Sequence, residues 1–150
     1  MKNRHARRLL EQSVAELRAA REHLDFSFAR TVDLRDDLQG AGDAQMESVE
    51  AYTSRFARAV DLLVNKVLRG LDEVEMEPPG TLLDAVLRAE KRGLVERADR
   101  LRELKAVRNA IVHDYAGTQL AEIFAYCRTH KAEFDQICDR TIAYARRLLT

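Results

Sequence analysis

The sequence is poor in the residues that interrupt helices or cross-link chains. Its 150 residues include 6 Gly, 2 Pro, 2 Cys and no Trp. Few glycines and prolines favour helices, because glycine costs backbone entropy and proline lacks an amide donor. On one continuous helix, Cys127 and Cys138 would lie about 16 Å apart, beyond the roughly 7 Å that a disulfide spans. We therefore expect an all-α protein with two buried or idle thiols.

Other absences limit the class of protein. The 25 Lys and Arg residues balance 25 Asp and Glu residues, which argues against a polybasic coating protein but allows a local basic groove. No apolar run approaches the roughly 18 residues of a membrane span, and Glu11 and Glu16 interrupt the apolar segment that a signal peptide requires. No HExxH, CxxC or glycine-rich phosphate loop indicates a metal or a cofactor. We expect a cytoplasmic protein that does not enter membranes.

Apolar residues recur at spacings of three, four and seven, the periodicity of amphipathic helices. With glycine and proline at the boundaries, this pattern predicts five helices: residues 4–39, 44–75, 81–92, 96–114 and 118–149. The last has a possible break near Thr129 and His130. Short connections favour an up-and-down bundle, and the length suits one domain over residues 1–150.

Several side chains of this bundle have two possible environments. Leu62, Leu68 and Leu71 flank the second helix, where they either seal a homodimer or cover later helices of the same chain. The phenylalanines fall at helical positions and are expected in the core: Phe26, Phe28, Phe56, Phe124 and Phe134. Four charged residues of the second helix are expected to form solvated pairs one turn apart: Glu47, Glu50, Arg55 and Arg58. Arg55 could instead belong to a rim that faces RNA.

The polar residues at the end of the fourth predicted helix carry the main functional signal. Arg108, Asn109, His113, Asp114 and Tyr115 lie within eight residues. The arginine fork matches phosphate oxygens, and histidine exchanges a proton near neutral pH. Together they suit cleavage of RNA without a metal, with imidazole as acid or base and guanidinium stabilising the phosphoryl group. Alternatively, both cations contact carbonyl groups at a helix C-terminus, where positive charge is favourable.

The spacing of this pair restricts how it could act. Arg108 and His113 are about 140° apart on an ideal helix, so a straight helix does not bring both to one phosphate. Either the helix ends or bends before His113, or a second copy completes the site in a symmetric homodimer. Asp61 lies in the apolar run 60–64, where a carboxylate is costly unless paired. It is expected to form a structural salt bridge or to orient Arg108 across the bundle.

The segment Arg108-Asn109, three further residues and His113-Asp114-Tyr115 resembles the R-x4–6-H signature of the HEPN superfamily. Tyrosine two residues after histidine resembles the HepT-type toxins, which pair with a minimal nucleotidyltransferase antitoxin. The resemblance implies a metal-independent endoribonuclease toxin, acting as a homodimer on RNA and silenced when the antitoxin transfers AMP to the tyrosine. It implies that Arg108 stabilises the phosphate and that His113 is the acid or base. It also implies that Asn109 orients His113 or the substrate and that Tyr115 accepts AMP.

A second branch of the superfamily competes with this interpretation. The segments 54–56, 61–66 and 89–93 are similar to those of non-catalytic subunits that bind substrate for a minimal nucleotidyltransferase. Such a subunit positions substrate for its partner and cleaves nothing. The lack of Trp, and of an acidic residue beside Phe56, departs from that pattern, and the complete Arg108, His113 and Tyr115 set favours the toxin. A purely structural helical adaptor is the third alternative.

Overall fold

The computed structural model describes residues 2–114 and 117–150, and all regular elements among them are helical. The elements in chain order are α1 (Lys2–Ala29), α2 (Asp43–Asp61), η1 (Leu62–Leu68), α3 (Arg69–Val74), α4 (Leu82–Lys91), α5 (Ala98–His113), α6 (Leu120–Thr129) and α7 (Lys131–Leu149). The element η1 is a π-helix, which is wider than an α-helix because its hydrogen bonds join residues five apart. The all-α prediction is therefore confirmed.

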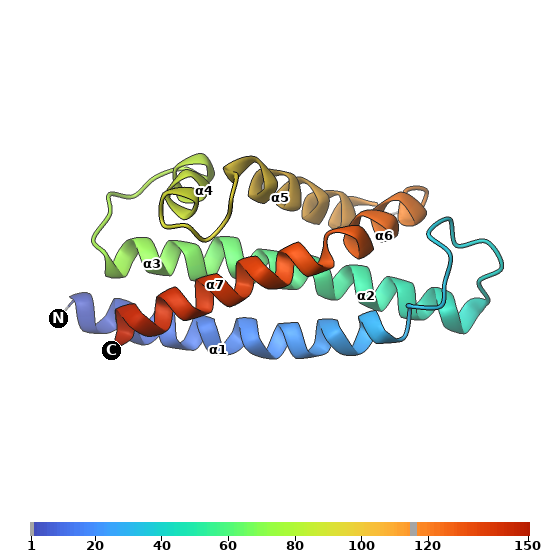
Figure 1. The fold of residues 1–150 in the computed structure, drawn as a ribbon, viewed down its shortest axis with the longest axis horizontal. Coiled ribbons are helices and arrows are strands. Elements are labelled where there is room, and N and C mark those ends of the chain that lie inside the picture. The colour runs from blue at the N-terminus through green and yellow to red at the C-terminus, as the bar shows by residue number, and fades with distance from the viewer. Residues whose placement is uncertain (1, 115–116) are drawn as a thin grey trace.

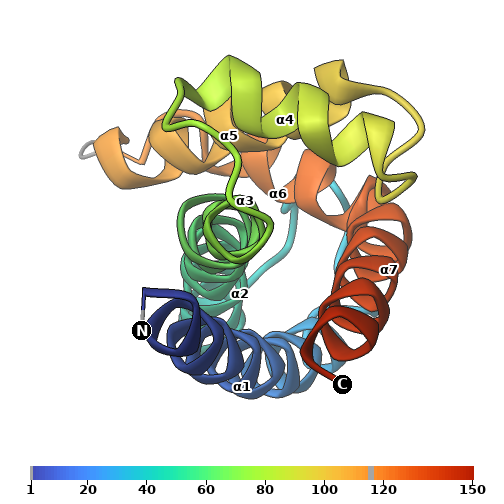
Figure 2. The same ribbon diagram turned by 90° about the vertical axis from the view of Figure 1, so that its left-hand side faces the viewer.

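The long helices lie along one axis. The continuous segment α2–η1–α3 runs beside α1, and α7 crosses both at an angle (Figure 1). The view along this axis shows α1 and α5 on opposite sides of α2, with α4, α5 and α6 together above it (Figure 2). Helix α2 packs against α1, α5 and α6. Its exposed residues, among them Ser54 and Arg58, form a narrow strip between α1 and α5.

The first predicted helix, residues 4–39, is too long. Helix α1 ends at Ala29, and turns occupy residues 30–42. The backbone carbonyl groups of Val32 and Leu34 accept hydrogen bonds from the Arg128 guanidinium of α6, so they are not used in a continuing helix. Leu38, which extended the apolar pattern, has a positive φ of 60° and packs against the core from a turn.

The predicted helix over residues 118–149 is divided in two. His130 has φ −100° and ψ 6° and ends α6 as well as preceding α7, so the break expected near Thr129 and His130 is present. With α2, η1 and α3 counted as one helix, the described residues form six helices, and the count of five is not confirmed.

The packing of the core shows which of the two expected environments the leucines beside the second predicted helix occupy. Leu68 and Leu71 are fully buried within one chain, and Leu62 packs against the same cluster. They therefore cover helices of their own chain. Four of the five phenylalanines join this core or its edge, but Phe26 is 62% exposed, so its prediction as a core residue is wrong. Phe26 is two residues from Leu24 and Phe28, which places it on the opposite side of α1.

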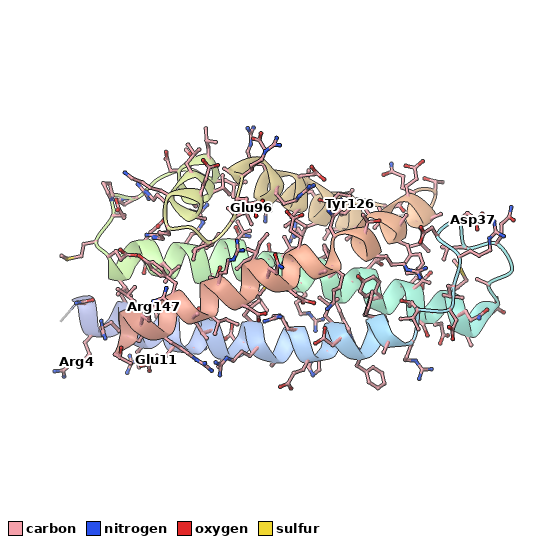
Figure 3. All side chains as sticks on the ribbon, viewed as in Figure 1. Arg4, Glu11, Asp37, Glu96, Tyr126 and Arg147 are labelled. Carbon is pink, nitrogen blue, oxygen red and sulfur yellow. The ribbon has the colours of Figure 1, made fainter. Side chains whose placement is uncertain are left out.

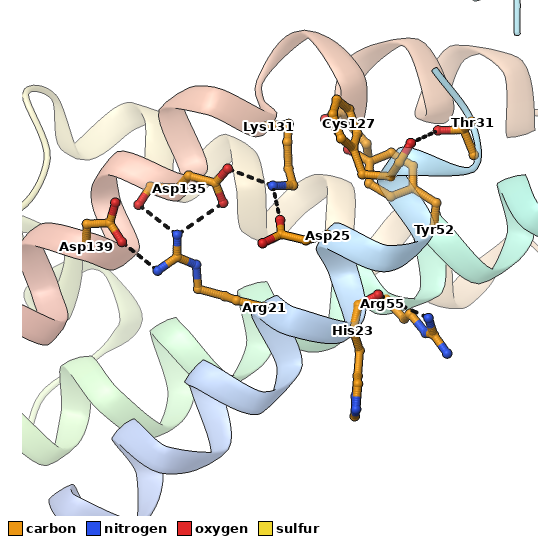
Figure 4. Close-up of polar contacts among 11 residues, drawn as sticks. Arg21, His23, Asp25, Thr31, Tyr52, Arg55, Cys127, Lys131, Asp135 and Asp139 are labelled. Carbon is orange, nitrogen blue, oxygen red and sulfur yellow. Dashed lines mark hydrogen bonds and ion pairs between the residues drawn. The ribbon is translucent and has the colours of Figure 1, made fainter. Parts of the chain in front are cut away.

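Five charged residues join α1 to α7 and are called the Lys131 cluster: Arg21, Asp25, Lys131, Asp135 and Asp139 (Figure 4). Lys131 is buried and donates to Asp25 (2.5 Å) and Asp135 (2.6 Å). Burial opposes the charge of Lys131, but the hydrogen bonds from its ammonium to Asp135 and Asp25 raise its pKa. This closed set of charges holds the two helices together.

Charged side chains cover the outer surface (Figure 3). Arg4, Glu11 and Arg147 extend outward at the end where the two termini lie. Among the described residues, no helix is both long and apolar enough to cross a membrane.

Candidate functional site

Helix α5 carries the predicted motif in its last two turns. Its first turns are anchored by Leu101 and Leu104, which are buried against the core, and by Glu90, whose carboxylate accepts the Ala98 amide at 2.6 Å. The buried leucines fix the rotation of the helix, so Arg108 faces the α2 side while Asn109 and His113 face solvent. Packing at one end of α5 thus orients the polar residues at the other.

The Arg108 guanidinium is held at two points. Its Nε lies 3.3 Å from Asp61 Oδ1, and its Nη1 donates to Asn109 Oδ1 at 3.1 Å. The Arg108 side chain remains 27% exposed, so part of the charged fork is open to solvent. Its contacts are to side chains, and no contact with a helix-end carbonyl group is present among the described residues.

Asp61 is the centre of a small charged group, called here the Asp61 cluster, which consists of Asp61, Asn65, Lys105 and Arg108. A single oxygen, Oδ1, accepts from Asn65 Nδ2 at 2.6 Å and from Lys105 Nζ at 3.0 Å, in addition to the contact with Arg108. Burial opposes ionisation of Asp61, but the hydrogen bond and charge of Lys105, the charge of Arg108 and the Asn65 hydrogen bond together lower its pKa. The pairing that the sequence demanded for Asp61 is therefore present.

The local backbone explains how Asp61 meets so many donors. Asp61 is the last residue of α2, and η1 begins directly after it. In a π-helix each turn holds more residues than in an α-helix, so the side chains near the junction are displaced from their usual register. Such segments occur often at functional sites. Here the junction joins α2 to α5 through one carboxylate oxygen.

His113 lies in the last turn of α5, with its side chain exposed. Helix α5 continues through His113, so it does not end before that residue. The separation of about 140° between Arg108 and His113 therefore stands. One copy of the chain presents the two side chains in different directions.

Asp114 follows α5 directly and makes local hydrogen bonds. Asp114 accepts the Gln119 amide through Oδ2 at 3.2 Å, and its carbonyl group accepts the Gly117 amide at 3.1 Å. Gly117 has a φ of 68°, a conformation that glycine adopts without strain. Asp114 also lines a small pocket with Glu50, Ser54 and other residues of α2, α5 and α6. Tyr115, the predicted acceptor of AMP, lies outside the described residues.

Comparison with known protein families identifies one family for this chain. The sequence model of a family described as "Ribonuclease HepT-like" matches residues 19–141. The chain belongs to the HepT-like ribonuclease family. No curated protein and no solved structure matches it. The matched range includes α5 and both residues of the Asp61–Arg108 contact, so the candidate site lies within the family region of this HepT-like chain.

Arg55, the other predicted support residue, does not join the Asp61 cluster. Its Nη1 donates to the His23 carbonyl group at 3.0 Å and to Ser27 Oγ at 2.7 Å, so it binds α1 (Figure 4). The predicted pairs with Glu47 or Glu50 are also not formed: among the described residues, neither Arg55 nor Arg58 has a salt bridge. In this HepT-like chain Arg55 and Arg108 lie on opposite flanks of α2.

Two members of the Asp61 cluster were missed by sequence reasoning. Lys105 precedes Arg108 by three residues, so both face the same helix, and this spacing was a signal that could have found it. Asn65 follows Asp61 by four residues, another spacing that brings side chains together. Among the described residues, no three His, Cys, Asp or Glu side chains are grouped as ligands of one metal ion.

Proposed function

We propose that the chain is a metal-independent endoribonuclease, the toxin of a toxin–antitoxin pair, and that it acts as a homodimer. The observation that carries this proposal is the continuity of α5 through His113. One helix directs Arg108 and His113 about 140° apart, whereas two copies around a twofold axis could present one of each to the same phosphate. The match to a ribonuclease family supports RNA as the substrate.

In the proposed reaction the His113 imidazole takes the proton of a ribose 2′-hydroxyl. The 2′-oxygen attacks the adjacent phosphorus, a new P–O2′ bond forms, and the P–O5′ bond breaks. A proton returned to O5′ completes the step, which leaves a 2′,3′-cyclic phosphate and a 5′-hydroxyl. The reaction requires RNA, because DNA has no 2′-hydroxyl.

Arg108 would stabilise the charge that develops on the phosphoryl oxygens. Its Nε already contacts Asp61 and its Nη1 contacts Asn109, so the guanidinium is held before substrate arrives. Such preorganisation lowers the cost of orienting the group during reaction. Asn109 would act as a helper by holding Arg108, in addition to the role towards His113 or the substrate that the family implies.

Regulation by a partner is the second part of the proposal. A minimal nucleotidyltransferase would transfer AMP to Tyr115, two residues after His113. The added phosphate would place a negative charge beside the proposed active site, where it would compete with RNA phosphate for Arg108. Coexpression with the nucleotidyltransferase, followed by mass spectrometry, tests this: a gain of one AMP in the wild type, absent from Tyr115→Phe, is expected.

The central experiment incubates purified protein with RNA and excess chelator. We expect the wild type to cut RNA, His113→Ala to be slower by about 10²- to 10⁴-fold and Arg108→Ala by about 10²- to 10³-fold. All three should give the same circular dichroism spectrum, because both side chains lie at the surface end of α5. A wild-type chain that leaves RNA intact but co-purifies with a small nucleotidyltransferase would instead be a substrate-binding subunit.

Mixed dimers test whether two copies share the site. One subunit carries Arg108→Ala, the other carries His113→Ala, and differently tagged chains are co-purified. If each site takes Arg108 from one copy and His113 from the other, one of the two sites is intact and about half of the wild-type activity returns. If each copy holds a complete site, both sites are damaged and the mixed dimer is as inactive as its parents.

A further inference from the structure

Phe26 is an aromatic side chain on the outside of a helical bundle, close to two arginines. The residue is 62% exposed. The guanidinium carbon of Arg30 lies 5.8 Å from the ring centroid, and that of Arg55 lies 6.0 Å from it. Arg30 follows the end of α1, the helix that carries Phe26, whereas Arg55 belongs to α2. The turn after α1 and helix α2 therefore each supply a cation near the ring.

Arg55 is fixed in this position. Its hydrogen bonds to the His23 carbonyl group and Ser27 Oγ use Nη1, and Ser27 is buried in α1. A guanidinium that is already ordered loses little conformational entropy when it binds a ligand. The Arg55 part of this arrangement is therefore preorganised.

The positive charge of this group is not neutralised. Among the described residues, neither Arg30 nor Arg55 forms a salt bridge. The nearest carboxylates along α1 are Glu22 and Asp25; Asp25 is bound to Lys131, and Glu22 contacts neither arginine. Two exposed arginines with carboxylate partners provide a contrast: Arg35 pairs with Asp37, and Arg97 lies close to Asp99. The group formed by Phe26, Arg30 and Arg55 is therefore suited to bind an anion.

The same face leads to the candidate active site. Arg55, Arg58 and Asp61 follow one another at intervals of three residues on α2, and each step turns the position by about 60° around the helix. They therefore cross the exposed strip of α2, from the side of α1 to the side of α5, over about 9 Å along the axis. Arg58, in the middle, is exposed and has no salt bridge among the described residues. At the far side, Asp61 contacts Arg108.

We propose that Phe26, Arg30 and Arg55 form an accessory binding site for single-stranded RNA, from which the strand passes over Arg58 to Arg108. An unpaired base stacks on the Phe26 ring, and the two arginines bind the neighbouring phosphates. Stacking of bases on exposed aromatic rings beside cations is the usual way in which proteins hold single strands without reading their sequence. The proposal rests on the proposed function only in taking RNA as the substrate.

Binding of a fluorescein-labelled, unstructured RNA oligonucleotide tests this site. Every protein carries His113→Ala to stop cleavage, and Kd is measured by anisotropy over a range of salt concentrations. We expect Phe26→Ala to raise Kd about 5- to 100-fold, and Phe26→Tyr to keep most of the affinity, since stacking tolerates any aromatic ring. Arg30→Ala should reduce the slope of log K against log salt by about 0.7, the value for one lost phosphate contact.

Matched controls come from other exposed positions. Leu87→Ala removes an apolar side chain of similar exposure (49%) from α4, and Arg146→Ala removes an exposed arginine from α7. Neither should change Kd. Unchanged binding in Phe26→Ala would overturn the proposal, and so would conversion of a dimer to a monomer by Phe26→Ala in light scattering, because the ring would then be a protein interface.

The cleavage assay separates this proposal from the proposed function. If the wild type cuts RNA and Phe26→Ala binds and cuts it equally well, the accessory site is refuted but the nuclease is not. Protein that binds RNA in a Phe26-dependent manner, but does not cut it in the wild-type form, refutes the nuclease and supports the accessory site.

Discussion

The Lys131 cluster between α1 and α7 and the Asp61 cluster between α2 and α5 use the same kinds of charged residues but differ in charge balance. In the Lys131 cluster two cations, Arg21 and Lys131, meet three carboxylates. In the Asp61 cluster two cations, Lys105 and Arg108, share one oxygen of one carboxylate. The first has more negative charge than positive, and the second retains positive charge.

This difference separates a structural role from a binding role. The Lys131 side chain is only 7% exposed and is satisfied by Asp25 and Asp135, so this cation is not available to bind an anion. Arg108 is 27% exposed, and the strip of α2 beside it adds Arg58 and Arg55, neither of which forms a salt bridge among the described residues. A chain of zero formal net charge thus has a local cationic face suited to RNA phosphates.

The same substitution at the two clusters should break different properties. Lys131→Met leaves Asp25 and Asp135 without their buried cation, and we expect the free energy of unfolding to fall by about 2 kcal/mol, less than for a fully buried pair because Asp25 is exposed. For a chain of this size that lowers Tm by about 4–8 °C. The rate of RNA cleavage at 25 °C should not change. Thermal unfolding and the chelator-treated cleavage assay measure both.

Lys105→Met is the matched control in the open cluster. Its partner Asp61 is 38% exposed and keeps contacts with Asn65 and Arg108, so the loss of stability should stay below about 1 kcal/mol. Cleavage should slow, because a cation beside the phosphate site is gone. If Lys105→Met were the more destabilising variant, or Lys131→Met the slower enzyme, the division into a structural and a binding cluster would be wrong.

Asp61→Asn tests whether the open cluster orients Arg108. An amide keeps the size of the side chain but loses the charge that holds Arg108 Nε at 3.3 Å. We expect kcat to fall about tenfold while KM changes little, since a guanidinium that is less well oriented stabilises the transition state more than the bound substrate. Steady-state kinetics with wild type, Asp61→Asn and Asp61→Glu measure the effect. An unchanged kcat in Asp61→Asn would contradict a positioning role.

Most of the helical architecture was predictable because apolar periodicity reports burial directly. The second predicted helix, residues 44–75, corresponds to α2–η1–α3 over residues 43–74, and the fourth, 96–114, to α5 over 98–113. The end of α1 was not predictable from periodicity, since it depends on Arg128, some 100 residues later, capturing the carbonyl groups of Val32 and Leu34. The π-helical geometry of η1 also left no pattern in the sequence.

The candidate site divides in the same way. The Arg108 and His113 motif and the pairing of Asp61 follow from residue types and spacing, but Lys105 and Asn65 become part of the site only through contacts across and along the bundle. Phe26 is a residue whose environment was predicted wrongly although the sequence held the signal. Its residue type suggested the core, whereas its position, out of phase with Leu24 and Phe28, places it on the surface. The position of Phe26 in the helical repeat therefore predicted its exposure better than its residue type did.

The smallest expected effect is a pH dependence of stability that belongs to the Asp61 cluster. The cations around Asp61 lower the pKa of its carboxyl group in the folded chain. A depressed folded-state pKa contributes stability above the unfolded pKa of about 3.9, and this contribution is lost as pH falls through the folded value. Wild type should therefore be more stable than Asp61→Asn at pH 7, by less than about 1 kcal/mol because the group is exposed, and the difference should shrink below about pH 4. Denaturant unfolding of both proteins from pH 3 to pH 7 measures it, and a difference that grows as the pH falls would show that the Asp61 charge opposes folding.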